Sequence, residues 1–191
     1  AQYTALDASL TDGGRRDVER DRRLEPGEHE RILAVFDAGV LARKQRPMVL
    51  PHPQSLRTLY VLALETAMRL REMYTLEVRQ VDLAKRTIFL DKTKNGDKRQ
   101  VPLSSVALAE LRTHLASLGD APPRVFPWWD GDSSHKVLVR MSDYLSKIFA
   151  GVFEQAGASE FRFHDLRHEA VCRLFERTAL HETAIMSFTR Q

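Results

Sequence analysis

Apolar residues recur at spacings of three and four over much of the chain, which is the period of an amphipathic helix. The pattern predicts helices that begin at Glu25–Glu28 and at Ser104 or Ser105, and further helices over 54–77, 141–155, 164–177 and 181–188. Within the 54–77 stretch, Arg69 falls near the end of the helix or at a bend in it. The chain is therefore expected to be mostly helical.

One part of the chain has the pattern of a β-hairpin instead. Thr87–Leu90 is β-branched and apolar, Asn95–Gly96 is a strong turn signal, and Gln100–Leu103 can return as the partner strand. The pattern predicts a small antiparallel sheet with Lys94 and Lys98 near the tip of the hairpin.

The remaining segments are predicted to be loops or tails. Residues 1–22 carry mixed charges and almost no apolar period, which is typical of a linker. Proline punctuates Arg46–Pro53, and 125–134 contains a Pro-Trp-Trp sequence that favours a loop. The fold expected from these patterns is one α+β domain, mostly helical, over residues 23–191.

Composition and charge point to an anionic partner. The chain has 191 residues with 29 Lys+Arg against 26 Asp+Glu, and 22 of the basic residues are arginines. Arginine favours bidentate recognition of phosphate or carboxylate groups. The chain contains no glycine-rich nucleotide-binding motif, so nothing in it supports nucleotide binding.

The same counts bear on the cellular compartment. The single cysteine, Cys172, excludes an internal disulfide bond and a zinc site made of several cysteines, and it fits a reducing cytoplasm. Apolar runs fall far short of the roughly 20 residues that a membrane span needs. No secretory signal opens the chain. We therefore expect a cytoplasmic protein that does not contact a membrane.

The sequence from His164 to His168 is the strongest candidate for chemistry. His164 and Arg167 lie three residues apart at the start of a predicted helix, with His168 close by, so they share one face. A helix N-terminus favours anions, and an arginine and a histidine beside it form a plausible phosphate site. The alternative for Arg167 alone is a surface arginine in a modest ion pair.

Two other interpretations compete with this one. His164, His168 and Cys172 form one helical stripe of possible zinc ligands, but they span about 12 Å of helix axis, too far for one tetrahedral ion. Cys172 is better explained as a small buried apolar residue, and no metal is expected. Trp128 and Trp129 either stack on nucleobases or pack onto their own core.

Three motifs in a fixed order indicate a family. The segments 63–73, 91–103 and 163–170 closely resemble the successive signatures of the tyrosine recombinase, or phage integrase, family, and the similarity covers residue 23 to the end. The resemblance implies the fold of the recombinase catalytic domain, preceded in the family by a separate N-terminal DNA-binding domain. One departure is Ala67, where the family often has glycine.

The resemblance also implies roles for individual residues. Arg69 and Arg167 would clamp the non-bridging oxygens of a scissile DNA phosphate, a bidentate task that suits arginine. Lys94 would protonate the leaving 5′ oxygen. His164 would take part in acid–base transfer, and His168 and Glu72 would support the site. The family uses neither a cofactor nor a catalytic metal, and it acts on double-stranded DNA attachment sites as a homo-tetramer.

The family's nucleophile is a tyrosine that attacks phosphorus and forms a 3′-phosphotyrosyl link. That tyrosine lies downstream of the His-x-x-Arg motif, whereas the tyrosines of this sequence all precede it: Tyr3, Tyr60, Tyr74 and Tyr144. We therefore expect the nucleophile to lie beyond Gln191. The function expected is a site-specific recombinase of a phage or other mobile element, and the alternative is an inactive, truncated recombinase-like protein that binds DNA.

Overall fold

The computed structural model describes residues 22–91, 98–119 and 122–177. Its helices are α1 (Glu28–Ala38), α2 (Pro53–Thr66), α3 (Leu70–Tyr74), the 3-10 helix η1 (Val78–Gln80), α4 (Ser105–Ser117), α5 (His135–Gln155) and α6 (Asp165–Arg177). Its strands are β1 (Val40–Leu41), β2 (Met48–Val49), β3 (Val81–Asp82), β4 (Thr87–Leu90) and β5 (Arg99–Pro102).

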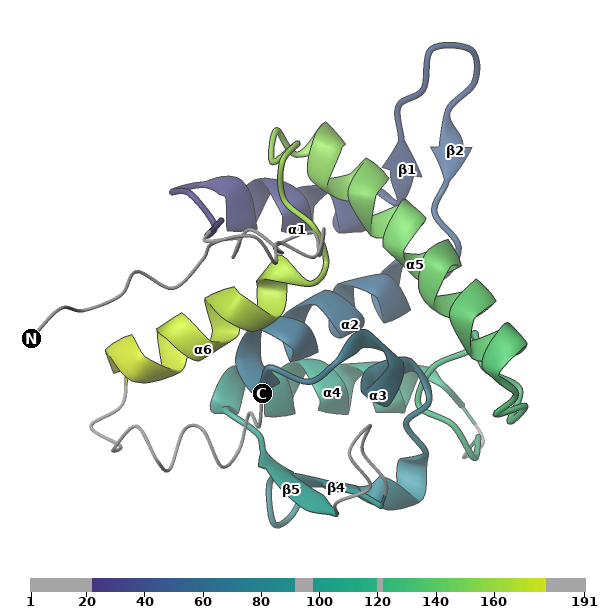
Figure 1. Ribbon diagram of the computed structural model, residues 1–191, viewed down its shortest axis with the longest axis vertical. Coiled ribbons are helices and arrows are strands. Elements are labelled where there is room, and N and C mark those ends of the chain that lie inside the picture. Colours follow the sequence, from purple (N-terminus) through teal and green to yellow (C-terminus); the bar gives the residue numbers. More distant parts are fainter. Residues whose placement is uncertain (1–21, 92–97, 120–121, 178–191) are drawn as a thin grey trace, which may run out of the picture.

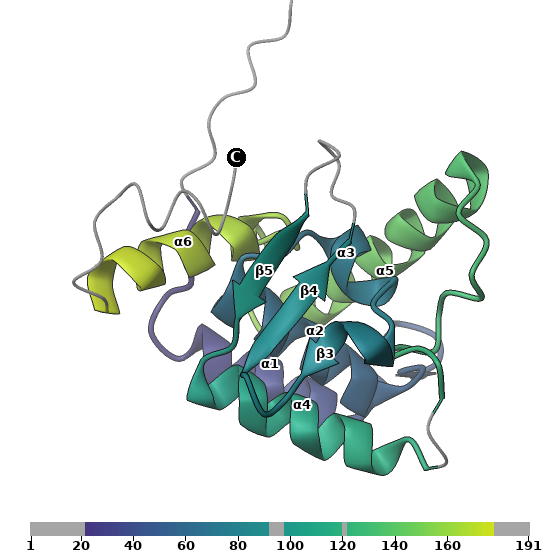
Figure 2. The same cartoon turned by 90° about the horizontal axis from the view of Figure 1, so that it is seen from below.

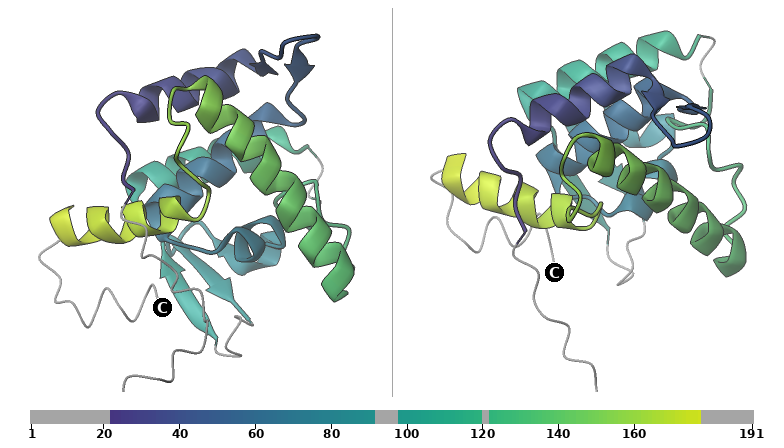
Figure 3. Two further views of the ribbon diagram at one scale, coloured as in Figure 1. Left: turned by 45° about the horizontal axis from the view of Figure 1, so that its top comes forward. Right: turned by 90° about the horizontal axis from the view of Figure 1, so that it is seen from above.

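Helix α2 lies at the centre of the fold, and α1, α4 and α6 all pack against it (Figures 1 and 3). It begins at Pro53, which suits the first helical position because the N–H that proline lacks has no partner there. Leu56, Leu59 and Leu62 are fully buried, as expected for a helix that neighbours enclose. This central position fixes the end of α2 relative to the helices that surround it.

Helices α1 and α5 add a second contact surface to this core. They pack against each other, with the rings of Phe36 and Phe149 5.9 Å apart in an edge-on arrangement. Phe149 also lies 4.5 Å from Phe163, which directly precedes the His164 to His168 segment. The aromatic core thereby fixes the start of α6.

The small sheet is antiparallel, with β4 between β3 and β5 (Figure 2). Ile88 pairs with Val101, and Leu90 pairs with Arg99. Side chains alternate between the two faces of a strand, and the inward positions of β4 and β5 are buried. Arg99 occupies one of these buried positions beside apolar residues.

The structure confirms most of the predicted elements. The β4–β5 hairpin is present, and Ser104 caps α4 by accepting a hydrogen bond from the amide of Ala107 at 3.1 Å. The predicted 54–77 helix is divided at residues 67–69. These include Arg69, which the pattern placed near the end of the helix or at a bend in it. The predicted helix over 181–188 lies outside the described residues, as does the tip of the hairpin with Lys94.

Two predictions were wrong, one about a loop and one about the start of a helix. The predicted loop Arg46–Pro53 contains β2, which pairs with β1, because strands of two residues are too short to show a period. Helix α5 begins at His135 rather than at 141, since the β-branched Val137 and Val139 weaken the helical signal of its first turns.

Candidate functional site

The site begins at a reversal of the chain after α2. Ala67 is fully buried and has a left-handed backbone with φ of 53°, a conformation that glycine adopts more easily. Two residues later, Arg69 has extended backbone and forms the N-cap of α3. The turn therefore ends one helix, starts the next and leaves the carbonyl of Ala67 accessible to another element.

That other element is α6. Arg167 lies in its first turn, is only 8% exposed and donates a hydrogen bond from Nη1 to the carbonyl oxygen of Ala67. Burial, followed by the positive charges of Arg69 and Arg99, lowers the pKa of Arg167 to about 10. Burial and two neighbouring cations make this place unfavourable for a positive charge, and an anion beside it would be favoured.

Glu72 connects Arg69 to Arg99. Its Oε1 accepts a hydrogen bond from Nη1 of Arg69 at 3.2 Å, and its Oε2 accepts from the Arg69 amide at 2.9 Å and from Nη2 of Arg99 at 2.7 Å. The Glu72 side chain is 8% exposed and that of Arg69 is 28% exposed. We call Arg69, Glu72, Arg99 and Arg167 the arginine cluster. It has three positive charges and one negative charge, and the Arg69 side chain is partly exposed to solvent.

A groove of about 800 Å³ extends from the arginine cluster between α3, the sheet and the start of α5. Arg69 and Glu72 line one part of it. The other lining residues are Arg71, Thr75, Glu77, Arg79, Gln80, Leu90, Asp91, Trp129, Ser133, Leu138 and Ser142. The groove therefore combines apolar surface with three arginines and three carboxylates.

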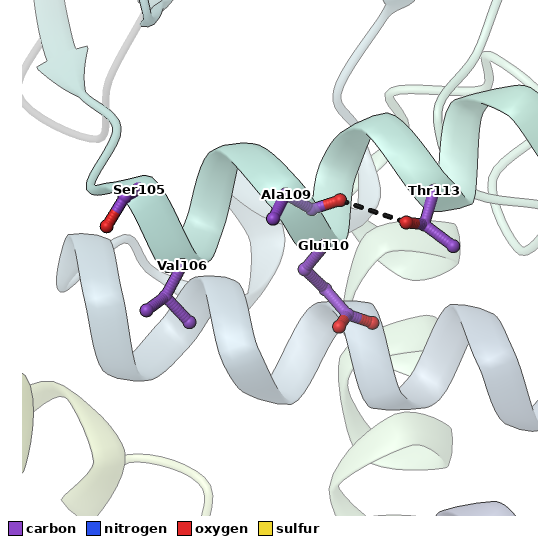
Figure 4. A pocket seen from close by; sticks show the side chains of 5 residues that line it. All are labelled: Ser105, Val106, Ala109, Glu110 and Thr113. Atoms are coloured by element: carbon purple, nitrogen blue, oxygen red, sulfur yellow. Dashed lines mark hydrogen bonds between the residues drawn. The ribbon is translucent and has the colours of Figure 1, made fainter.

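A second hollow lies on α4 and does not border the arginine cluster. It is lined by Ser105, Val106, Ala109, Glu110 and Thr113 (Figure 4). Its carboxylate, Glu110, accepts a hydrogen bond from Thr58 Oγ1 at 3.1 Å and lies 3.5 Å from Nε of Arg57. These contacts tie α4 to α2, so we assign this hollow a structural role.

The predicted histidines lie near the cluster along the chain, with different exposures. His164 is exposed and directly precedes α6, where its carbonyl accepts the amide of Arg167 at 3.1 Å. His168 is half-buried, with Nε2 3.6 Å from Sγ of Cys172. The structure thus brings together Arg69, Glu72 and Arg167, and Lys94 lies outside the described residues.

The competing interpretations can be compared with these contacts. Among the described residues, no group of three or more His, Cys, Asp or Glu side chains is placed to hold a metal ion. Trp128 stacks on Phe126 at 5.9 Å, which supports the core-packing alternative for this residue. The guanidinium of Arg124 lies over the ring of Trp129, 5.4 Å from its centre.

No helix in the described part of the chain is long and apolar enough to span a membrane.

Sequence reasoning missed Arg99. The sequence predicts the hairpin but not the role of Arg99, because the charged residues of the turn, Lys94 and Lys98, lie beside it and make it resemble another turn residue. A signal was present, since the alternation along β5 puts Arg99 on the same face as the buried Val101. A charged residue at an inward strand position needs a partner, and here Glu72 provides one.

The sequence has clear relatives. Residues 22–184 match the phage integrase family. A shufflon-specific DNA recombinase of Escherichia coli is 31% identical over 174 residues, which are 89% of this chain and 37% of that protein. The chain therefore spans well under half of the length of this relative.

Solved structures give the same answer for the fold. XerA recombinase superposes with a TM-score of 0.61 and 14% identity over 88% of this chain and 56% of that chain. The integrase of transposon Tn1549, solved with transposon right end DNA, superposes with a TM-score of 0.60 and 19% identity. The match covers 91% of this chain and 59% of that chain. Together with the match over residues 22–184, these likenesses establish that the chain has the fold of a recombinase catalytic domain and belongs to the phage integrase family, the tyrosine recombinases.

Proposed function

We propose that this chain is the catalytic domain of a site-specific DNA recombinase and that the arginine cluster holds the scissile phosphate. The observation that carries the proposal is the convergence of Arg69 and Arg167 on the turn at Ala67, with the pKa of Arg167 lowered by burial and by neighbouring arginines. Two guanidinium groups suit the two non-bridging oxygens of a phosphodiester, and they stabilise the charge that develops on these oxygens during attack.

The nucleophile in this proposal is a tyrosine downstream of Gln191. Tyr60 is buried, and its hydroxyl oxygen lies 2.9 Å from Nδ1 of His29. Burial raises the pKa of Tyr60, so its hydroxyl is a poor nucleophile. Tyr74 is buried and donates to the carbonyl of Leu138 at 2.9 Å. Tyr144 lies on α5, which contributes no residue to the arginine cluster. Tyr3 lies outside the described residues.

The reaction proceeds by exchange of one phosphoester bond for another. The tyrosine oxygen forms a bond to phosphorus, the bond from phosphorus to the 5′ oxygen breaks, and Lys94 gives a proton to that leaving oxygen. His164 accepts the proton that the tyrosine hydroxyl loses, while Glu72 and His168 support the arginines. The 3′-phosphotyrosyl link keeps the energy of the broken bond, so a 5′ hydroxyl can reverse the step without ATP or a metal.

The partner in this proposal is double-stranded DNA. The Tn1549 integrase was solved with transposon DNA, and XerH recombinase, with a TM-score of 0.59 and 19% identity over 86% of this chain, was solved bound to its difH substrate. From the family resemblance we propose further that the full protein works as a homo-tetramer on the attachment sites of a phage or another mobile element. From its single cysteine we propose that it works in the reducing cytoplasm. The second candidate, a recombinase-like protein that occupies DNA without cutting it, is favoured by the unsuitable environments of Tyr60 and Tyr74.

Covalent trapping distinguishes these two functions. The protein encoded by the extended reading frame, and this chain beside it, are incubated with nicked duplexes from the ends of the encoding element, and adducts are resolved on a denaturing gel. We expect an adduct with the longer protein that Arg167→Ala abolishes. Arg86→Gln, an exposed charge change in the turn before β4, should leave the adduct intact. Salt-sensitive binding without an adduct would support the second candidate.

A further inference from the structure

We propose that Arg99 is a positioning residue of the phosphate site: it neutralises Glu72, so that Arg69 remains available to the scissile phosphate. This inference rests on the proposed function. Arg99 acts through Glu72 and Arg69 and is not assigned a contact with DNA. It would be a further member of the site, contributed by the sheet rather than by a helix.

The first observation is the place of Arg99 in β5. Its side chain is 7% exposed and shares the inward face of the strand with the fully buried Val101. Burying a guanidinium is unfavourable unless it is paired and hydrogen-bonded, and an apolar residue would fill such a position more stably. An arginine at an inward position of the strand, bonded to a buried glutamate, is therefore better explained by the site than by the stability of the sheet.

The second observation is the way Glu72 divides its oxygens. Oε2 accepts both Nη2 of Arg99 at 2.7 Å and the Arg69 amide at 2.9 Å, whereas Oε1 accepts Nη1 of Arg69 at the longer distance of 3.2 Å. The shortest of these bonds thus goes to Arg99. Glu72 holds the backbone and side chain of Arg69 in place, and its negative charge is shared between two guanidinium groups, with the shorter bond to Arg99.

The third observation concerns charge. With Arg99 present, the cluster has three cations and one anion, and the positive field of Arg99 reaches Arg167, whose pKa it helps to lower. Without Arg99, Glu72 and Arg69 would form a neutral pair. The carboxylate would then compete with the phosphate for the Arg69 guanidinium, and the site would lose affinity although both phosphate-binding arginines remain.

The test is a double-mutant cycle in the 191-residue chain. Affinity for a short fluorescein-labelled DNA duplex is measured by anisotropy at fixed salt, and each variant's thermal unfolding is recorded in parallel. We expect Arg99→Gln to weaken binding by about tenfold in the wild-type background but by less than about twofold in the Glu72→Gln background. Arg86→Gln, which removes the same charge at the other end of β4, should weaken binding by less than about twofold.

Equal losses from Arg99→Gln with and without Glu72 would overturn the proposal, because a direct DNA-binding role of Arg99 predicts no such coupling. A purely structural ion pair would also couple the two residues, but its loss would lower the melting temperature in parallel with the affinity, and that result would overturn the proposal as well. Arg69→Gln and Arg167→Gln separate this result from a failure of the proposed function: if neither weakens binding, the cluster is not a phosphate site at all. If Arg99→Gln does not fold, Arg99→Lys, which keeps the charge with one ammonium group, and the paired Arg99→Met/Glu72→Met variant complete the same comparison.

Discussion

Nη1 of Arg167 donates a hydrogen bond to the carbonyl oxygen of Ala67, although 100 residues separate the two in sequence. The bond connects the first turn of α6 to the turn between α2 and α3. It depends on the left-handed backbone at Ala67, because that conformation ends α2 and turns the chain toward Arg69. The backbone of this turn is therefore as much a part of the proposed phosphate site as the guanidinium groups.

The first prediction tests this turn. Ala67→Val places a β-branched side chain in left-handed backbone at a fully buried position, and we expect a loss of about 2 kcal/mol in the free energy of unfolding. Ala67→Gly is the matched control, since glycine adopts this backbone freely but loses one buried methyl group, and its stability should stay within about 1 kcal/mol of wild type. Urea denaturation measures both. Equal stability of the two variants would contradict the role given to the backbone.

The second prediction concerns the charge of Arg167. Because this cation is buried beside Arg69 and Arg99, we expect Arg167→Gln to be as stable as wild type or more stable by about 1 kcal/mol at neutral pH and low salt. Sulfate should raise the melting temperature of wild type more than that of the variant, since it binds the folded cluster. A variant that is much less stable and equally sensitive to sulfate would refute this explanation.

The difference in stability between wild type and Arg167→Gln should depend on pH in one direction. The pKa of Arg167 is lowered to about 10, so between this pH and its ordinary value the unfolded state binds more protons than the folded state. The unfavourable charge is present in full below pH 10 and disappears as the pH rises through this value. The stability advantage of Arg167→Gln should therefore shrink above about pH 10. Guanidinium NMR of wild type would show the titration directly.

The third prediction concerns Glu169, which ties the start of the described chain to α6. It is 3% exposed and accepts hydrogen bonds from Nε of Arg23 at 3.0 Å and from Nε of Arg173 at 2.6 Å. Burial alone would raise the pKa of Glu169, but these hydrogen bonds lower it below its ordinary value. Its stabilising effect is therefore complete at neutral pH and is lost as the pH falls through the lowered pKa.

We expect Glu169→Gln to reduce the free energy of unfolding by about 2 kcal/mol at neutral pH and by much less in acid. Glu176→Gln is the control, because Glu176 also binds Arg23 but is 55% exposed, and it should change stability by less than about 0.5 kcal/mol. Chemical denaturation at both pH values measures the effect. Similar losses for both variants would contradict the importance of burial.

The fourth prediction uses His114, a buried histidine on α4. Its Nε2 lies 2.8 Å from the carbonyl oxygen of Val125, its ring stacks on Phe126 at 5.2 Å, and burial lowers its pKa. The folded state therefore holds it neutral, and its contribution declines as the pH falls below the ordinary value of about 6.5. Between pH 7 and about pH 5, wild type should therefore lose more stability than His114→Gln, as chemical denaturation at the two pH values measures.

The exposed His135 supplies the control for this experiment. His135→Gln should follow the wild-type pH dependence, because this side chain is exposed and, within the described part of the chain, makes no contact with the core that protonation could disrupt. Loss of acid sensitivity in both variants would assign the effect to surface charge rather than to burial.

The sequence motifs predicted Arg69, Glu72 and Arg167 as members of one site, and the structure brings these three together. Periodicity alone could not do this, because it assigns each residue to an element without placing the elements against one another. Periodicity also gave His164 and Arg167 one face, yet His164 is exposed and Arg167 is buried, since burial is decided by what packs against the start of α6.

Arg99 escaped prediction for a related reason. A strand of four residues gives only two inward positions, which is too few for a period to stand out against the charged turn beside it. The β1–β2 pair escaped because two residues give no period at all. The tertiary partner of Arg99, rather than its local pattern, reveals its place in the site.

The pairing of Leu90 with Arg99 also has a consequence for folding fidelity. A slip of one residue between β4 and β5 would reverse the faces of β5, sending Arg99 to solvent and Gln100 inward. Glu72 would then face Arg69 without its counter-ion from the sheet. A misaligned hairpin would thus inactivate the proposed phosphate site even in a molecule whose helices are all correctly assembled. Only chains in which β4 and β5 pair in the correct register would be active.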